Sequence, residues 1–305
     1  MPKHAIGDAL TTEAYAAALP YAPSWLDRLM RAVEKLPVPF WLTYLLLGLG
    51  EYAVLQAALW IGEPEMRFVW QRETALFPLW TWGVLALITQ LNHQAIAALH
   101  NFRPLLEDED ADMRLLSYEI TTIPARTVLL GTPVWLAVFA LIALTNATIQ
   151  QHRGNPISFP ALLLTGAAAF LIGSSIYVHS LHQLRMVNRL YYRMRKINMF
   201  HLFPVYSFSG LTAQTAIGYI TLIVVTQFLY PQSWENLDII ALNLGQILLA
   251  AAVFILPLRH AHTRLVNGKQ RLQAEAARRM ETALQRLHQV VDEENVAALD
   301  GLNKI

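Results

Sequence analysis

The stretch IYVHSLHQLRMVNRLYYRMRKINMF, residues 176–200, decides the class of this protein. It begins inside the apolar segment Phe159–Ser180 and then carries basic residues without any break in its helical pattern. These basic residues are Arg185, Arg189, Arg193, Arg195 and Lys196. About 20 predominantly apolar residues are enough for a helix to cross the ~30 Å hydrocarbon core of a bilayer. The stretch therefore predicts a membrane helix that leaves the bilayer here and continues outside it.

The composition of the whole chain agrees with a membrane protein. Of its 305 residues 55% are apolar and only 15% are charged, and the mean hydropathy is +0.35. Soluble domains contain about 25% charged residues. Six segments are long and apolar enough to span: Phe40–Ile61, Leu76–Leu99, Thr127–Ala147, Phe159–Ser180, Leu211–Tyr230 and Leu237–Leu258. We therefore expect an all-α polytopic bundle of six transmembrane helices at residues 40–258, with close helix packing around Gly166 and Gly173.

The distribution of Lys and Arg predicts the topology. Twenty of the 23 basic residues lie before the first span, after the last span, or in the two long loops that follow spans two and four. The other side holds only Arg67, Arg72 and Arg153. By the positive-inside rule both termini are expected to be cytoplasmic, in a multi-pass protein of the plasma membrane.

Residues 1–39 form an N-terminal cytoplasmic segment with a short amphipathic helix. Ser24 is a suitable N-cap, and Asp27 lies three residues later, where a capping box places its acid. Pro37 and Pro39 end the helix. We expect this helix to lie on the inner membrane surface, and the rival interpretation is a docking helix for a cytoplasmic partner.

Residues 259–305 are expected to form a cytoplasmic amphipathic helical tail. Apolar residues recur along one face at Leu265, Leu272, Ala276, Met280, Ala283, Leu287 and Val291. An apolar stripe on a helix about 50 Å long needs a partner that covers it. The partner is expected to be the same helix of another subunit in a homo-oligomer, the basic helix of residues 176–200, or a cytoplasmic protein.

Glu51 lies near the middle of the first span, between Gly48 and Gly50 on one side and Ile61 on the other. A carboxylate at this depth is costly unless it is neutralised or paired. The polar residues Asn243 and Gln246 of the last span are the candidate hydrogen-bond partners. A structural hydrogen bond between helices and a role linked to protons or substrate are both open.

Arg185, Arg189 and Arg193 follow one another at four-residue steps, so they lie on one helical face. Like charges on one face repel unless anions lie between them. The candidate anions are lipid phosphates, the acidic run at residues 107–112, and a nucleic acid or nucleotide. Lipid or the acidic loop is favoured. Nucleic acid is not expected, because the chain has no nucleic-acid-binding motif.

His179 and His182 lie three residues apart on one helical face, and His93, His100, His260 and His262 are expected at the same depth. Together they form a possible metal or haem site, and the competing interpretation is interfacial hydrogen bonding. The absence of cysteine excludes disulfides, thiolate metal sites and covalent c-type haem. No motif of a hydrolase, kinase or nucleotide-binding loop is present. We expect no enzymatic activity and no cofactor.

Two approaches to membrane spans resemble each other. Residues 118–127 (YEITTIPART) align without gaps with residues 206–215 (YSFSGLTAQT), at an offset of 88 positions. Tyr, a hydroxyl residue, an aliphatic residue, Ala and Thr recur at matching positions. This pattern raises the hypothesis of three tandem helical hairpins.

Four segments resemble a family of bacterial multi-pass membrane proteins with a charged C-terminal helix and no assigned activity: residues 118–126, 195–200, 204–213 and 302–304. The resemblance implies that in longer relatives the tail leads to a further span. Residues 119–131 (EITTIPARTVLLG) and the six-span plan are more weakly similar to permease subunits of ABC-2-type exporters. The chain differs from those permeases in its long charged tail and in its outer turn near Pro231.

The function that we expect is a non-enzymatic scaffold or signal relay that acts through the tail. The alternative is a membrane transport protein, either an ABC-2-like permease subunit or an oligomeric channel, with Glu51 and the polar groups of the last two spans lining a path.

Overall fold

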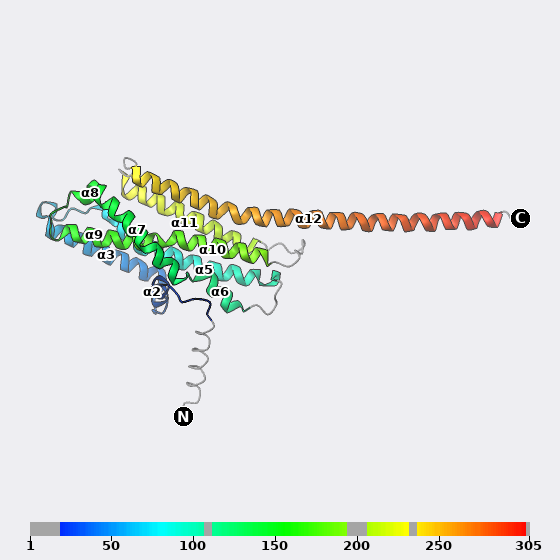
Figure 1. Ribbon diagram of the computed structural model, residues 1–305, viewed down its shortest axis with the longest axis horizontal. Coiled ribbons are helices and arrows are strands. Elements are labelled where there is room, and N and C mark those ends of the chain that lie inside the picture. The colour runs from blue at the N-terminus through cyan, green and yellow to red at the C-terminus, as the bar shows by residue number, and fades with distance from the viewer. Residues whose placement is uncertain (1–18, 107–111, 194–205, 232–236, 303–305) are drawn as a thin grey trace, which may run out of the picture.

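The computed structural model describes residues 19–106, 112–193, 206–231 and 237–302, and helices make up almost all of this part of the chain (Figure 1). In chain order the α-helices are α2 (Trp25–Glu34), α3 (Phe40–Gly62), α4 (Leu76–Pro78), α5 (Val84–Phe102), α6 (Met113–Thr121), α7 (Ala125–Thr145), α8 (Ala147–Gln150), α9 (Ser158–Gly173), α10 (Ser175–Tyr192), α11 (Ser207–Leu229) and α12 (Leu237–Leu302). Short 3-10 turns flank the longer helices, and a π-helical turn, η3 (Leu79–Gly83), joins α4 to α5. The prediction of an all-α protein is confirmed.

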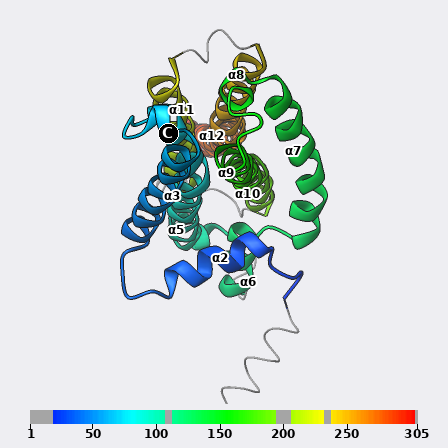
Figure 2. The same cartoon turned by 90° about the vertical axis from the view of Figure 1, so that its left-hand side faces the viewer.

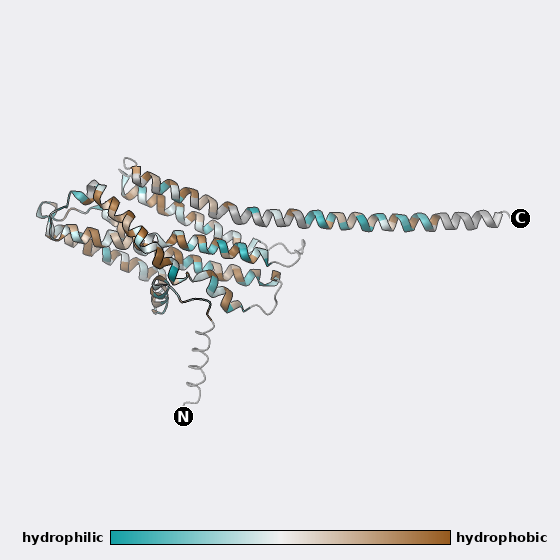
Figure 3. Cartoon of the chain, viewed as in Figure 1, coloured by the Kyte–Doolittle hydropathy of each residue, from teal (hydrophilic) through white to brown (hydrophobic). Residues whose placement is uncertain are grey.

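Five helical segments within the described residues are long and apolar enough to cross a membrane: Phe40–Gly62, Arg72–Leu105, Ala125–Thr145, Ser158–Tyr192 and Ser207–Leu229. They correspond to the first five predicted spans, and the brown colour of their ribbons in Figure 3 marks their apolar residues. The sixth predicted span coincides with the beginning of α12, where many side chains lie outside the described part and only Asn243–Ala252 counts as a shorter apolar helix. Six spans and three tandem hairpins therefore stay predictions.

Two of these segments are longer than a bilayer requires. Arg72–Leu105 has 34 residues and Ser158–Tyr192 has 35. At 1.5 Å per residue each measures about 50 Å. Their extra length lies on the side where α12 leaves the bundle, which we call the tail side (Figure 1). The helix of the opening stretch thus continues beyond its apolar part to Tyr192, while Arg195 and Lys196 lie outside the described residues.

These extensions are held together by a hydrophobic core of their own at the tail side. It joins the ends of α5 and α10 to α6 and to the start of α11. Phe102 packs against Tyr191 and Phe208, with ring centroids 5.5 and 5.3 Å apart. Leu184, Val187 and Tyr191 share the face of the opening stretch that lies opposite Arg185, Arg189 and Arg193, and all three are buried. The remaining two positions of that face, Met194 and Asn198, lie outside the described residues.

Helix α2 lies across the bundle near the point where α3 and α7 begin (Figure 2). The predicted capping box is present: the Ser24 hydroxyl accepts from the Asp27 N–H, and the Asp27 carboxylate accepts from the Ser24 N–H. The prediction that α2 lies on the inner membrane surface stays a prediction, but its apolar face is not left to lipid. Leu26, Met30 and Val33 are buried in the core of the protein's own bundle.

Helix α12 has 66 residues and runs without interruption from the bundle into an isolated tail (Figure 1). At 1.5 Å per residue it is about 100 Å long. Its first part packs against α10 and α11. The predicted tail is thus helical as far as Leu302, while its place as a cytoplasmic domain after a membrane domain stays a prediction.

Candidate functional site

A π-helical turn interrupts the second membrane helix and organises the candidate site. The turn, Leu79–Gly83 with the sequence LWTWG, follows Pro78. Proline has no N–H to donate to the preceding turn, and glycine is a weak helix former, so both residues favour a local departure from α geometry. Single π turns inside α-helices often occur at functional sites. Here the turn places Trp80 and Trp82 in two different surroundings.

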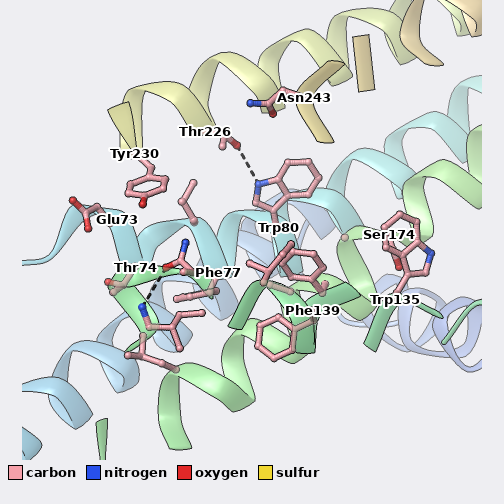
Figure 4. Close-up of a pocket in the computed structure, with 18 of the residues that line it drawn as sticks. Glu73, Thr74, Phe77, Trp80, Trp135, Phe139, Ser174, Thr226, Tyr230 and Asn243 are labelled. Atoms are coloured by element: carbon pink, nitrogen blue, oxygen red, sulfur yellow. Dashed lines mark hydrogen bonds between the residues drawn. The ribbon is translucent and has the colours of Figure 1, made fainter. Parts of the chain in front are cut away.

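On the Trp80 side lies a cavity of about 180 Å³ (Figure 4). Its walls come from α4, η3, α7, α8, α9, α10, α11 and α12 and from the 3-10 turn Arg72–Ala75. Most of the wall surface is aromatic or aliphatic. The aromatic lining residues are Phe77, Trp80, Trp135, Phe139, Phe170, Tyr177 and Tyr230. At one end the cavity reaches Glu73 and Asn146, which lie at helix ends on the side away from the tail.

Two glycines allow the helices around the cavity to approach closely. A β-carbon at Gly173 would lie 3.1 Å from Cε3 and 3.2 Å from the carbonyl oxygen of Trp80. A β-carbon at Gly166 would lie 2.7 Å from Cε2 of Phe139. The predicted close packing at these two small residues is confirmed, because a larger residue at Gly166 would displace α7 from α9.

Polar side chains also line the cavity, and those near its centre are deeply buried. The indole N–H of Trp80 donates to Oγ1 of Thr226 over 3.1 Å. Asn243 and Gln246 of α12 are only 5% and 4% exposed, and both line the cavity. The Tyr177 hydroxyl faces the Gln246 amide. Nδ2 of Asn243 and Oε1 of Gln246 have no hydrogen-bond partner within the described part of the chain.

Glu51 lies on the Trp82 side of the π turn and is not part of the cavity wall. Its Oε1 and the Trp82 Nε1 are both buried without a hydrogen-bond partner among the described residues, although the indole faces the carboxylate. No hydrogen bond in this part of the chain joins Glu51 to Asn243 or Gln246. Trp82 is the neighbour of Glu51 in the described part of the chain, and both interpretations of Glu51 stay open.

Arg185, Arg189 and Arg193 are all exposed at the tail-side end of α10. In the described ranges none of them forms an ion pair with a carboxylate. Of the acidic run, residues 107–111 lie outside these ranges, so its contact with the arginines stays a prediction. The exposed face is equally suited to lipid phosphates.

His179 and His182 do not face a common ligand position. Nε2 of His182 donates to the carbonyl oxygen of Glu119 over 2.6 Å, so this nitrogen is not free to bind a metal. His179 is fully buried and neither of its ring nitrogens has a partner among the described residues. No group of three potential metal ligands occurs among the described residues, and the side chains of His260 and His262 lie outside them.

Buried polar contacts that the sequence did not predict lie on the side away from the tail. Gln56 of α3 is completely buried, and its Nε2 donates to Oγ1 of Thr74 over 2.5 Å and to the Gln71 carbonyl over 3.0 Å. Glu63 pairs with His152, a contact that ties α3 to the connection between α8 and α9. A single glutamine in an apolar span gave no signal of its partners, because these lie in irregular turns.

A second missed feature holds the N-terminal segment to the bundle. The Tyr21 hydroxyl donates to the Thr122 carbonyl over 2.9 Å, and the Tyr118 hydroxyl donates to the Tyr21 carbonyl over 2.8 Å. The Ala125 N–H donates to the Ala22 carbonyl over 3.2 Å. We call residues 21–27 bound to residues 118–125 the N-terminal clasp. Burial raises the pKa of Tyr21, because its phenolate would be poorly solvated there.

Asp27 is the charged group of the clasp. Its carboxylate accepts from the Ser24 hydroxyl over 2.6 Å and from the Ser24 N–H over 3.0 Å, and it also interacts with the backbone of Ile123. Burial raises the pKa of Asp27, and the hydrogen bonds from Ser24 oppose this shift.

Comparisons with protein-family models, with curated proteins and with solved structures find no significant match to this chain. The two resemblances described above therefore stay predictions, and the residues of the site itself carry the functional argument.

Proposed function

We propose that this protein is a non-enzymatic bacterial inner-membrane protein that acts as a scaffold or signal relay through its helical tail. The proposal includes six membrane spans with both termini in the cytoplasm. The observation that carries it is the continuity of α12, which forms a wall of the membrane cavity at Asn243 and Gln246 and extends as one helix to Leu302. A continuous helix transmits a displacement or rotation at one end to the other.

The tail offers the surface that a partner would cover. Every residue from Lys269 to Gln289 is exposed, and large apolar side chains lie among the charged ones. The exposed apolar residues include Leu272, Met280, Leu284, Leu287 and Val291. The last four follow one another at steps of 4, 3 and 4, which is the spacing of a coiled-coil seam. Leu284 was not part of the stripe predicted from the sequence, yet it completes this spacing.

A second copy of the same chain is the partner that this seam fits best. Identical parallel helices bring each seam residue opposite its counterpart, and two membrane domains in one bilayer already hold their tails parallel. Confinement to one membrane raises the effective concentration of the tails, so that a short seam is sufficient for association.

The test is a double substitution in the seam, Leu284→Asp with Leu287→Asp, in the full chain. The matched control, Thr282→Asp with Gln289→Asp, adds the same two charges on the opposite helical face. We expect cross-linking in membranes and light scattering of the purified protein to show loss of the oligomer for the seam variant only, because buried like charges repel. Unchanged assembly in the seam variant, or unchanged assembly and partner binding after deletion of residues 269–305, would refute the proposal.

The transport alternative gains no support from the cavity. A path for ions or polar substrates at the depth of Glu51 needs polar lining groups, whereas the cavity is mainly aromatic and aliphatic and does not include Glu51. A membrane protein with a mainly apolar cavity is better suited to receive a hydrophobic signal than to conduct a polar one.

A further inference from the structure

The cavity contains two unsatisfied hydrogen-bonding groups of opposite kind. Nδ2 of Asn243 is a donor without an acceptor, and Oε1 of Gln246 is an acceptor without a donor, within the described part of the chain. The two residues lie three positions apart on α12, so their amides are neighbours on one helical face. Buried polar groups in proteins are nearly always hydrogen-bonded, and an unpaired one is costly away from water. This pair is a candidate position for the polar group of a ligand.

The amides of Asn243 and Gln246 define the chemistry of the group that would bind there. It must accept a hydrogen bond from Asn243 and donate one to Gln246, and a hydroxyl group does both. It must also be uncharged, because the described residues that line the cavity include no lysine or arginine to neutralise an anion. A phosphate or an ionised carboxylate therefore does not fit this position.

The rest of the cavity favours a hydrocarbon chain. Phe77, Phe139 and Phe170 line it, together with Leu162 and Ile142. An apolar cavity of about 150 Å³ stays dry and binds small hydrocarbons. The cavity here, about 180 Å³, holds part of one lipid chain rather than a whole phospholipid.

The bilayer itself is the source of such a ligand. Helix α7 packs on α8, α9 and α10, whereas α12 packs on α10 and α11, so the two helices form separate walls of the cavity. In Figure 2 α7 stands at the edge of the bundle beside α9 and α10. Its outward side chains, such as Leu130 and Leu141, are exposed and apolar, as expected for a helix in lipid.

We infer that this cavity is a binding site for an uncharged, hydroxyl-bearing lipid such as a monoacylglycerol, a diacylglycerol or a long-chain alcohol. The hydroxyl lies between Asn243 and Gln246, and the chain lies along Phe77 and Phe139. The lipid would contact α12, the helix that forms the tail. Its role as an input signal therefore rests on the proposed relay.

Tryptophan quenching tests the site, because Trp80 and Trp135 line the cavity. The full-length protein is titrated with monoacylglycerol that carries bromine on its chain, a contact quencher of indole fluorescence. The difference between the wild type and Trp135→Phe isolates the signal from the cavity. Brominated fatty acid at alkaline pH and brominated phosphatidylcholine show whether a charged head group is accepted. Brominated diacylglycerol and brominated long-chain alcohol show which hydroxyl lipid binds best.

We expect saturable quenching by the hydroxyl lipids, with half-saturation at least tenfold lower than for the fatty-acid anion or the phospholipid. Asn243→Leu and Gln246→Leu, which keep the volume but remove the amide, should each raise the half-saturation concentration about tenfold. Leu244→Ala, on the exposed side of the same helix, is the matched control and should bind as the wild type does.

Equal quenching by all head groups, or wild-type binding by both leucine variants with unchanged helical content, would overturn the inference. The tail variant Leu284→Asp with Leu287→Asp separates the two proposals. If it binds lipid normally but does not assemble, both proposals stand. If the oligomer is unaffected in that variant while lipid binding is confirmed, the relay fails and the lipid site remains.

Discussion

The N-terminal clasp and the cavity are both buried and both contain polar side chains, but they differ in how those side chains are satisfied. In the clasp the hydroxyl or carboxylate of Tyr21, Ser24 and Asp27 has a partner within the chain. In the cavity the amides of Asn243 and Gln246 each leave one atom unpaired within the described residues. The clasp therefore uses its polar groups to stabilise the folded state, whereas the cavity presents polar groups that a ligand could bind.

The largest effect should come from removing a partner in the clasp. Ser24→Ala takes away the N-cap of α2 and one of the hydrogen bonds that the buried Asp27 carboxylate accepts. The loss of an N-cap costs about 1 kcal/mol, and a buried carboxylate that loses a hydrogen bond costs about 1 kcal/mol more. We expect the free energy of unfolding to fall by about 2 kcal/mol in a detergent unfolding titration.

Ser24→Thr is the matched control, because it keeps a hydroxyl at the same position and should lie close to the wild type. A Ser24→Ala protein as stable as the wild type would show that the clasp is only a surface contact. The statement that the satisfied polar groups of the clasp stabilise the folded state would then be wrong.

The second effect should be smaller and of opposite sign. Asn243→Leu replaces an amide with an unpaired N–H by an apolar side chain of similar volume in an apolar wall. Replacing an unsatisfied buried polar group is expected to raise the free energy of unfolding by about 1 kcal/mol without added lipid. The same titration measures it, and Leu244→Ala again serves as control. A clear loss of stability in Asn243→Leu would mean that the amide is already satisfied, and the cavity would resemble the clasp.

Much of the architecture was predictable from the sequence, because span length and helical periodicity depend on local composition. The five spans, the capping box at Ser24, and the close packing at Gly166 and Gly173 all follow from such local rules.

What the sequence did not reveal are the contacts between distant segments. Tyr21 meets Thr122 at a separation of 101 positions, and Trp80 meets Thr226 at a separation of 146. Such pairings depend on how the helices are arranged in the bundle, and a single sequence does not encode them as a local pattern. The π turn was missed for a related reason, since only Pro78 and Gly83 indicate it. Asn243 and Gln246 were the predicted partners of Glu51, but the neighbour that the structure gives it is Trp82.

The smallest effect should be a change with pH in the free energy of unfolding, because Asp27 gives the clasp a buried titratable group. Burial raises the pKa of Asp27, so the folded state holds this proton more tightly than the unfolded chain does. The resulting contribution to stability is complete below about pH 4, the ordinary pKa of aspartate, and it is lost as pH rises through the raised pKa. Asp27→Asn keeps an acceptor for Ser24 but does not titrate.

The stability of Asp27→Asn relative to the wild type should therefore increase from pH 4 to pH 7. Unfolding titrations at several pH values measure this difference, and Glu275→Gln in the exposed tail is the control, for which the curve should follow that of the wild type. Parallel curves for Asp27→Asn and the wild type would show that Ser24 and the Ile123 backbone compensate the cost of burying this carboxylate. The buried charge of the clasp would then carry no net cost, whereas the cavity keeps unpaired amide groups among the described residues.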